Sequence, residues 1–182
     1  MNVNGLSHYD LVVPTPPDIV DGMTSQWNTV RPDLDVSPMA VIGRISRLSR
    51  LVDRRLEQNF GAHGIEAWMY DVLATLRRSG EPYELAAGDL VRQTMVTTGA
   101  MTNRVDRLEE RGLVERTSTG DRRKVIVRLT QKGLDLVDSV APSHLDTERE
   151  ILSVLSPRQQ RELVQLLRTT LLGLGDEQIE KG

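Results

Sequence analysis

The sequence predicts a mostly helical chain with one small β-hairpin. Apolar residues recur every three or four positions along most of the chain, which is the period of amphipathic helices. Two short segments, residues 113–118 and 124–129, differ, and in the second of them Val125, Val127 and Leu129 fall on alternate positions as in a half-buried strand. A length of 182 residues favours one domain with appendages, and an aromatic content of 3% suits helices packed on helices.

The N-terminal region is predicted to be an extension that carries one short helix. Three prolines between positions 14 and 17 forbid a helix in residues 1–17. Asp18 is a good N-cap, and the apolar residues behind it share one helical face up to Arg31-Pro32. That face consists of Ile19, Val20, Met23, Trp27 and Val30. Residues 32–36 then form a linker.

Two longer helices are expected next. Ser37-Pro38 combines an N-cap with a proline at the first helical position, and the helix behind it is expected to end at Gly61. Its arginine-rich face is interpreted as solvated surface. A third helix over residues 64–79 has an apolar inward stripe that includes Trp68, and Asp71 lies off this stripe.

A helix-turn-helix pair followed by a hairpin is predicted in the middle of the chain. A short helix over residues 86–93 begins with weakly capping alanine and glycine, so its stability must come from packing. A tight turn leads to a second helix over residues 98–111, and two strands then flank a Gly-Asp-Arg-Arg turn. A helix that can enter a DNA groove, beside a basic hairpin that can reach the DNA backbone, is a winged helix-turn-helix.

Two further helices are expected at the C-terminal end. Thr130 caps a helix from Gln131 onward, which is expected to be interrupted or kinked at Pro142. Ser156-Pro157 with Gln159 starts the last helix. The leucine-rich face of this last helix is too apolar for the exposed tail of a monomer, so we interpret it as half of a homodimer core.

These elements divide the chain into three predicted regions. Residues 1–37 form an N-terminal extension that contributes to the dimer and to a ligand pocket. Residues 38–63 and 131–175 form a helical dimerisation region, and residues 64–130 form the DNA-binding lobe. The predicted fold class is therefore mostly α with a small β-wing, assembled as an obligate-type homodimer through its N- and C-terminal helices.

Composition and motifs exclude several other classes of function. The chain has no cysteine, and His8, His63 and His144 lack metal-ligand spacing, so we expect neither a metal nor another cofactor. We expect no enzyme, because no nucleophile is paired with a base and no glycine-rich phosphate loop is present. An apolar run long enough to span a membrane and a secretory signal are both lacking, which predicts a cytoplasmic protein without a membrane partner.

The charge distribution points instead to DNA. The chain has a net charge of −3, whereas residues 97–128 alone sum to +3 and residues 1–37 sum to −4. Such a local basic surface is what a sequence-specific DNA binder needs. Side chains on the second helix can reach base edges or phosphates, and arginines in the hairpin turn can reach the minor groove or its phosphates. The candidate DNA-binding residues are Thr98, Thr102, Asn103, Arg107, Arg122 and Arg123.

This region resembles the MarR family of dimeric winged-helix regulators. The matching residues are Arg104-Val105-Asp106-Arg107-Leu108-Glu109, Gly112-Leu113-Val114, Asp121-Arg122-Arg123, and Val127-Arg128-Leu129-Thr130 with Gly133. The resemblance covers about residues 38–173. It implies a homodimer that binds pseudo-palindromic double-stranded DNA, usually as a repressor. It also implies release of the DNA when a small-molecule effector binds between the dimer region and the DNA-binding lobes.

The N-terminal extension and segments as far as residue 104 resemble the urate-responsive PecS and HucR subgroup of this family. The similar segments contain Trp27 with Arg31-Pro32, Tyr70-Asp71-Val72-Leu73, and Leu90-Val91-Arg92 followed by Asn103-Arg104. In that subgroup an extra N-terminal helix carries a tryptophan over the ligand pocket, which an aspartate and two arginines complete. The resemblance therefore implies an effector site for urate or a related purine anion, formed by Trp27, Asp71, Arg92 and Arg104.

The chemistry of these side chains suits such a ligand. Trp27 offers an aromatic face to a planar purine, and Arg104 offers a bidentate fork to its oxygens. Asp71 and Arg92 are expected to pair in the empty protein, so that an arriving anion repels the carboxylate and competes for the arginine. Each residue also has a purely structural interpretation, as an anchor, an ion pair or a phosphate contact. Two alternatives stay open, namely a response to another organic anion, such as a phenolic or tricarboxylate, and a winged-helix interaction module.

Overall fold

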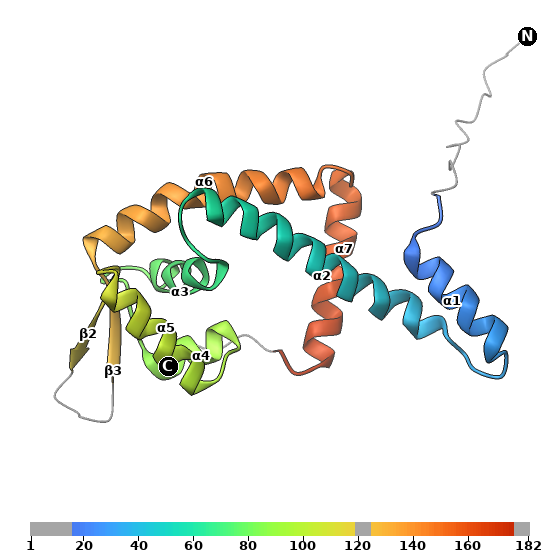
Figure 1. Cartoon of the computed structure of the whole chain (residues 1–182), viewed down its shortest axis with the longest axis horizontal. Coiled ribbons are helices and arrows are strands. Elements are labelled where there is room, and N and C mark those ends of the chain that lie inside the picture. Colours follow the sequence, from blue (N-terminus) through green and yellow to red (C-terminus); the bar gives the residue numbers. More distant parts are fainter. Residues whose placement is uncertain (1–15, 119–124, 177–182) are drawn as a thin grey trace, which may run out of the picture. The chain divides into compact units, whose positions relative to one another are not determined.

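The computed structural model describes residues 16–118 and 125–176, which form two compact units (Figure 1). The first unit lies within Met1–Leu51 and the second within Val52–Gly182. Helix α2 (Ser37–Ala62) contributes its first half to one unit and its second half to the other. The packing of each unit follows from the residues within that unit.

The first unit pairs α1 (Ile19–Val30) with the beginning of α2. Asp18 forms the predicted N-cap, in a reciprocal capping box with Asp21. Arg44 on α2 donates to both carboxylates, with its Nε 2.9 Å from Asp18 Oδ2 and its NH2 2.6 Å from Asp21 Oδ1. Val20 is buried over Gly43, where an added Cβ would lie 3.2 Å from Val20 Cγ1. The glycine therefore permits the close approach of the two helices.

Both predicted ends of α2 differ by one residue from the observed ends. Ser37 is the first helical residue rather than the cap, and the Asp35 carboxylate accepts a hydrogen bond from the Ser37 N–H at 2.9 Å. The helix also continues through Gly61 to Ala62. Glycine lowers helix propensity by only about 1 kcal/mol, and the burial of the neighbouring Phe60 side chain offsets that cost.

The core of the second unit is built around α3 (Ala67–Arg78). This helix contacts α6 (Gln131–Leu152) and also the pair α4 (Ala87–Thr94) and α5 (Thr98–Glu110). Apolar side chains from all of these elements are fully enclosed. They include Met69, Val72, Leu73, Leu76, Leu90, Met101, Leu108 and Val140.

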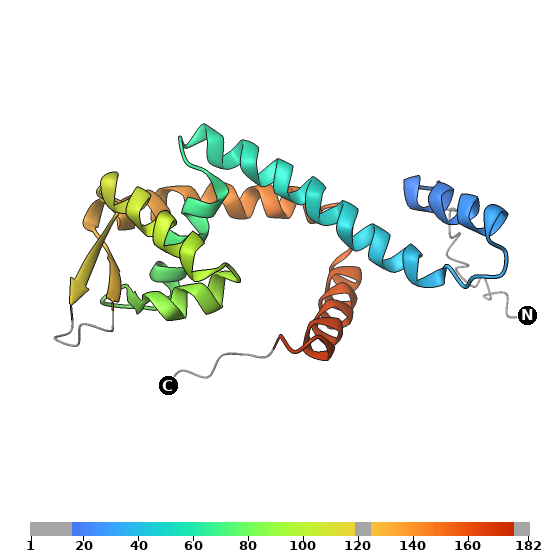
Figure 2. The ribbon, with the colours of Figure 1, turned by 60° about the horizontal axis from the view of Figure 1, so that its bottom comes forward.

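A three-stranded antiparallel sheet completes this unit. Its order is β1 (Glu84–Ala86), β3 (Val125–Leu129) and β2 (Val114–Ser118), and the predicted strands β2 and β3 are confirmed. Figure 2 shows β2 and β3 side by side, beyond the end of α5 and the start of α6. The sequence analysis did not predict β1, because three residues are too few to show an alternating pattern. Its pairing depends on a distant partner, since Glu84 faces Arg128 and their side chains lie 2.5 Å apart.

In the helix-turn-helix pair, a side chain caps the N-terminus of the second helix but not that of the first. Helix α4 has no side-chain cap, as predicted, and it ends where Met95 adopts a left-handed conformation with φ of 54°. Thr97 caps α5 by accepting from the Ala100 N–H at 3.3 Å. Gly112, with φ of 67°, turns the chain out of α5 into β2.

Of the two C-terminal helices, α6 departs from the prediction at one position, whereas α7 begins as predicted. Thr130 caps α6 as expected, but the helix runs through Pro142 without the interruption that the proline suggested. A proline removes only one backbone donor, and the buried Val137 and Val140 in the turn before it hold this part of the helix against the core. Helix α7 (Pro157–Gly173) begins with the predicted capping box between Ser156 and Gln159.

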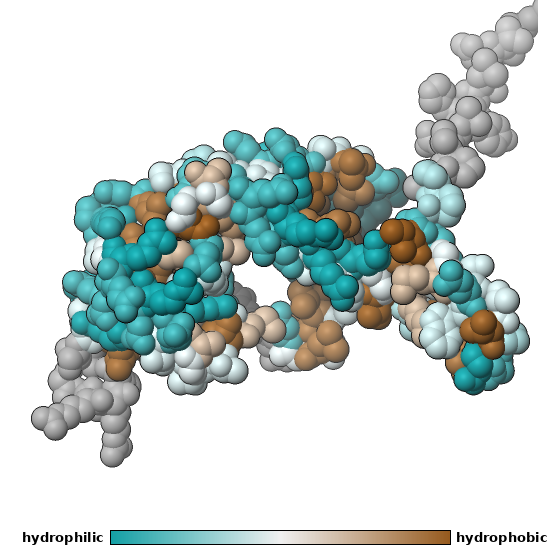
Figure 3. All heavy atoms as spheres, viewed as in Figure 1, coloured by the Kyte–Doolittle hydropathy of each residue, from teal (hydrophilic) through white to brown (hydrophobic). Residues whose placement is uncertain are grey.

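Large apolar faces lie uncovered on the single chain. Helix α7 has no buried residue, and Leu166, Leu171 and Leu172 are about half exposed or more. Figure 3 shows hydrophobic surface over part of α7, in contrast to the hydrophilic surface over α5. Several apolar residues of α2 are similarly exposed, including Val41, Ile42 and Leu48. None of the helices in residues 16–118 and 125–176 is long and apolar enough to cross a membrane.

Candidate DNA interface and effector site

The first half of α5 presents a hydrophilic face to solvent. Met101, Val105 and Leu108 point into the core and fix the orientation of the helix. On the other side, Thr98, Thr102 and Asn103 are all exposed, as are the neighbouring Gly99 and Ala100. The structure therefore brings three predicted DNA-binding residues onto one accessible surface, next to the free N–H groups at the start of the helix.

An arginine on β2 forms ion pairs between the wing and α5. Arg116 on β2 pairs with Asp106, at 2.5 Å between NH2 and Oδ1, and also with Glu109. These contacts set the position of the hairpin relative to the helix. The predicted wing residues Arg122 and Arg123 lie outside the described residues.

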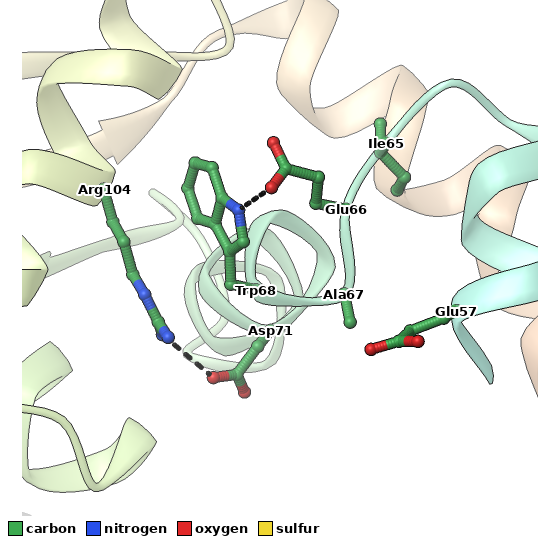
Figure 4. A pocket seen from close by; sticks show the side chains of 7 residues that line it. All are labelled: Glu57, Ile65, Glu66, Ala67, Trp68, Asp71 and Arg104. Atoms are coloured by element: carbon green, nitrogen blue, oxygen red, sulfur yellow. Dashed lines mark hydrogen bonds and ion pairs between the residues drawn. The ribbon is translucent and has the colours of Figure 1, made fainter. Parts of the chain in front are cut away.

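A cavity of about 590 Å³ lies beside α3 and is bounded by the end of α2 and by α5 (Figure 4). It combines three carboxylates, one guanidinium and one indole with smaller apolar groups. Its lining residues are Glu57, Ile65, Glu66, Ala67, Trp68, Asp71 and Arg104. The cavity is large enough for a small planar molecule.

Asp71 and Arg104 meet in this cavity, as Figure 4 shows. Arg104 NH1 lies 3.8 Å from Asp71 Oδ2, and the guanidinium carbon lies 5.9 Å from the centre of the Trp68 ring. Burial raises the pKa of the Asp71 carboxyl, although Arg104 and Arg78 act in the opposite direction. The ion pair thus joins α3 to the recognition helix through a carboxylate that is partly desolvated.

Arg92 has a different partner from the one expected. It pairs with Asp89, three residues earlier on α4, whereas Asp71 pairs with Arg104. The expected ion pair between Asp71 and Arg92 is therefore wrong for this structure. Residues three apart on a helix lie on one face, so Asp89 is within reach of Arg92 without any tertiary contact.

Trp27 lies in the first unit and contributes to a separate cavity there. This cavity measures about 370 Å³ and is almost entirely apolar. Trp27 is 41% exposed, and the other walls come from α1 and the start of α2. The lining residues are Val20, Met23, Thr24, Trp27, Pro38, Met39, Ile42 and Gly43.

The sequence analysis missed the contribution of Trp68, Glu66 and Glu57 to the larger cavity. Trp68 lies on the apolar stripe of α3 and was interpreted as a core residue. The side chain does pack against the core, and its indole N–H also donates to Glu66 Oε2 at 2.7 Å (Figure 4). An indole N–H needs a partner when it is not in water, and an acid two residues away was the signal available in the sequence.

Arg107 also belongs to this cluster. Its NH2 lies 2.6 Å from Glu66 Oε1, and its guanidinium carbon lies 4.6 Å from the centre of the Trp68 ring. The hydrogen bond from Trp68 and the charge of Arg107 both lower the pKa of Glu66, against the effect of desolvation. Arg107, a predicted DNA-binding residue, is therefore paired within the protein in this structure.

The fold and this surface together define a class of protein. A helix-turn-helix with an accessible, hydrophilic recognition helix and an attached β-wing is the architecture of a DNA-binding transcriptional regulator. A sequence model of the MarR family matches residues 63–124, which include both helices of the motif. The transcriptional regulator PecS of Dickeya dadantii (strain 3937) is 42% identical over 149 residues, which are 81% of this chain and 90% of PecS. The chain belongs to the MarR family and is similar to its PecS-like members.

Solved structures support the same assignment. AbsC, a MarR family regulator of Streptomyces coelicolor, superposes with a TM-score of 0.72 at 25% identity, over 79% of this chain and 98% of AbsC. Sco3205, another MarR family regulator of that organism solved in complex with DNA, gives a TM-score of 0.71 at 26% identity. This match covers 78% of this chain and 89% of Sco3205. The predicted mostly helical fold with a small wing is confirmed.

Proposed function

We propose that the chain is a homodimeric repressor that urate, or a related purine anion, releases from a pseudo-palindromic operator. The observation that carries this proposal is the ion pair between Asp71 on α3 and Arg104 on α5, which face one cavity. A ligand that takes Arg104 from Asp71 acts directly on the recognition helix. The resemblance to urate-responsive relatives supplies the ligand class, and the cavity chemistry supports it.

The lining of the cavity favours a purine over a tricarboxylate. Glu57, Glu66 and Asp71 place three carboxylates beside a single guanidinium, that of Arg104. A tricarboxylate adds several negative charges and offers only acceptors to such a site. Urate carries one charge near neutral pH, and it presents N–H donors to carboxylates and carbonyl oxygens to an arginine. Its flat ring also matches the face of an indole. Trp68 supplies such a face in the cavity, and the resemblance to the urate-responsive subgroup implies a second one from Trp27.

The exposed apolar faces support the homodimer. Isolated soluble monomers rarely expose contiguous apolar surface on the scale of the leucine-rich face of α7. A second copy would cover this face and present two recognition helices to successive major grooves. Each subunit would then contact one half-site of the operator through its accessible Thr98, Thr102 and Asn103.

The release step follows from the position of the effector site. Urate binding to Arg104 breaks the ion pair with Asp71 and sets a negative charge beside that carboxylate. The resulting repulsion and the new contact both bias α5 away from its DNA-binding position. A ligand shifts the equilibrium between the DNA-binding and released positions of α5 only if it binds one of them more tightly. The exchange of Asp71 for urate as the partner of Arg104 provides this difference in affinity.

A titration with urate tests the proposal. The purified protein is bound to a labelled duplex selected from a random pool, and urate is added while DNA anisotropy and tryptophan fluorescence are followed. The chain has two tryptophans, so Trp27→Phe leaves Trp68 as the only reporter. We expect saturable quenching together with DNA release, and a weaker urate response in Trp27→Phe at similar DNA affinity. DNA binding that urate leaves unchanged would reject the purine and retain the regulator.

A further inference from the structure

Glu66 uses both of its carboxylate oxygens to hold groups around Trp68. One oxygen accepts the indole N–H of Trp68 at 2.7 Å, and the other pairs with Arg107 at 2.6 Å. The guanidinium of Arg107 meanwhile lies over the indole ring, 4.6 Å from its centre. Arg107 is thus held by an opposite charge and by an aromatic face, both supplied by the beginning of α3.

We propose that Glu66 is a positioning residue that withholds Arg107 from DNA. This inference rests on the proposed function, in which Arg107 is one of the DNA-binding residues. Glu66 holds the NH2 group of Arg107 through one oxygen, and its opposite charge beside the guanidinium lowers the attraction of Arg107 for a phosphate or a base acceptor. Glu66 therefore competes with DNA for Arg107.

The strength of this competition is limited by solvent. The side chains of Arg107 and Glu66 are 49% and 55% exposed. Ion pairs with this exposure are weak, so loss of the Glu66 charge should tighten DNA binding by about two- to fivefold. A contact of that size suits a residue that adjusts affinity without preventing binding.

The same residues connect Arg107 to the effector cavity. Glu66 and Trp68 both line the cavity, whereas Arg107 contacts the Trp68 ring and is not among the lining residues. A planar ligand packed on Trp68 immobilises the indole, which keeps the hydrogen bond to Glu66 and hence the pair with Arg107. Occupancy of the cavity thereby favours the state in which Arg107 is unavailable to DNA.

The variant Glu66→Gln tests the proposal, because its amide oxygen still accepts from Trp68 while its charge on Arg107 is lost. We expect this variant to bind a selected duplex about two- to fivefold more tightly than wild type without urate. The same substitution in an Arg107→Ala background should change the affinity by less than about 1.5-fold, since no arginine remains to be released. Glu57→Gln is the matched comparison, because it removes a carboxylate from the same cavity without freeing Arg107.

Four outcomes would contradict the proposal. Equal tightening in Glu57→Gln, or in the Arg107→Ala background, would assign the effect to general charge removal. Weaker binding by Glu66→Gln would mean that the carboxylate orients Arg107 for DNA. Urate should also release DNA less effectively from Glu66→Gln than from wild type, and an equal release factor would separate Glu66 from the effector response. Wild-type protein that binds no duplex would instead reject the proposed function itself.

Discussion

Asp71 occupies a position where burial and charge act in opposite directions. Its carboxylate is partly removed from water beside Trp68, which raises its pKa, while Arg104 stabilises the ionised form. The ion pair is loose at 3.8 Å, and therefore does not cancel the cost of burial. A carboxylate that is costly to ionise in the folded protein is well placed to respond to a ligand that changes the charge around it.

Replacement of Asp71 with asparagine is expected to stabilise the protein increasingly as the pH rises above the unfolded-state pKa of an aspartate, about 4. Folding raises the pKa of Asp71, so the stability that its protonated form contributes is present below the unfolded-state pKa. It is lost as the pH rises through the folded-state pKa, and asparagine does not undergo this loss. The side chain remains 45% exposed, so the effect should be modest. Urea unfolding at several pH values measures it.

Asp33→Asn provides a control of opposite sign. The pKa of Asp33 is lowered by its hydrogen bonds from Arg31, so its stabilising effect is present above the unfolded-state pKa and lost as the pH falls. Asp33→Asn should therefore lose stability relative to wild type as the pH rises, whereas Asp71→Asn gains it. A difference for Asp71→Asn that stays constant with pH would contradict the assigned burial effect.

At the scale of elements, one glycine sets the junction between the wing and α6. An added Cβ at Gly133 would lie 2.0 Å from the Leu113 carbonyl oxygen, which is backbone and cannot turn away. We expect Gly133→Ala to reduce the free energy of unfolding by about 1–3 kcal/mol, because the start of α6 must shift away from the strand. Thermal unfolding followed by circular dichroism measures the change.

Gly99→Ala is the matched comparison within α5. Apart from its own helical backbone, nothing lies within 4 Å of its added Cβ, so the substitution should stabilise the helix by about 0.5–1 kcal/mol. It should also weaken DNA binding if the backbone at this end of α5 approaches the duplex closely. Equal thermal stability of Gly133→Ala and wild type would show that the junction is looser than its geometry indicates.

The sequence predicted elements whose signals are local. The N-cap at Asp18, the capping box at Ser156, the two wing strands and the recognition helix all depend on residues within a few positions of one another. What it missed depends on distant partners. The strand β1 exists because β3 lies beside it, and Trp68 lines a cavity because Arg104 and Arg107 arrive from another helix. Asp71 was assigned the wrong arginine for the same reason, since no local pattern identifies a tertiary ion pair.

At the scale of the whole molecule, the uncovered face of α7 predicts that the chain does not function alone. Leu171→Glu, combined with Leu166→Glu, places two charges on a face where these residues are now 48% and 68% exposed. We expect the variant to be monomeric in analytical ultracentrifugation and to bind DNA much more weakly, because each desolvated carboxylate in the interface is strongly unfavourable. Gln165→Glu on the same helix, also exposed, serves as the control for added charge.

The twofold symmetry of the proposed homodimer makes a prediction about its operator. Two recognition helices related by a twofold axis should contact half-sites whose centres are about 10–10.5 bp apart, one turn of B-DNA. Five extra base pairs between the half-sites rotate one of them by about half a turn, so that a rigid dimer can reach only one. Binding to the extended duplex should then fall to the level of a duplex with a single half-site in an anisotropy titration, at a fixed salt concentration. Unchanged affinity would indicate that one subunit reads the DNA, and the exposed face of α7 would then need another partner.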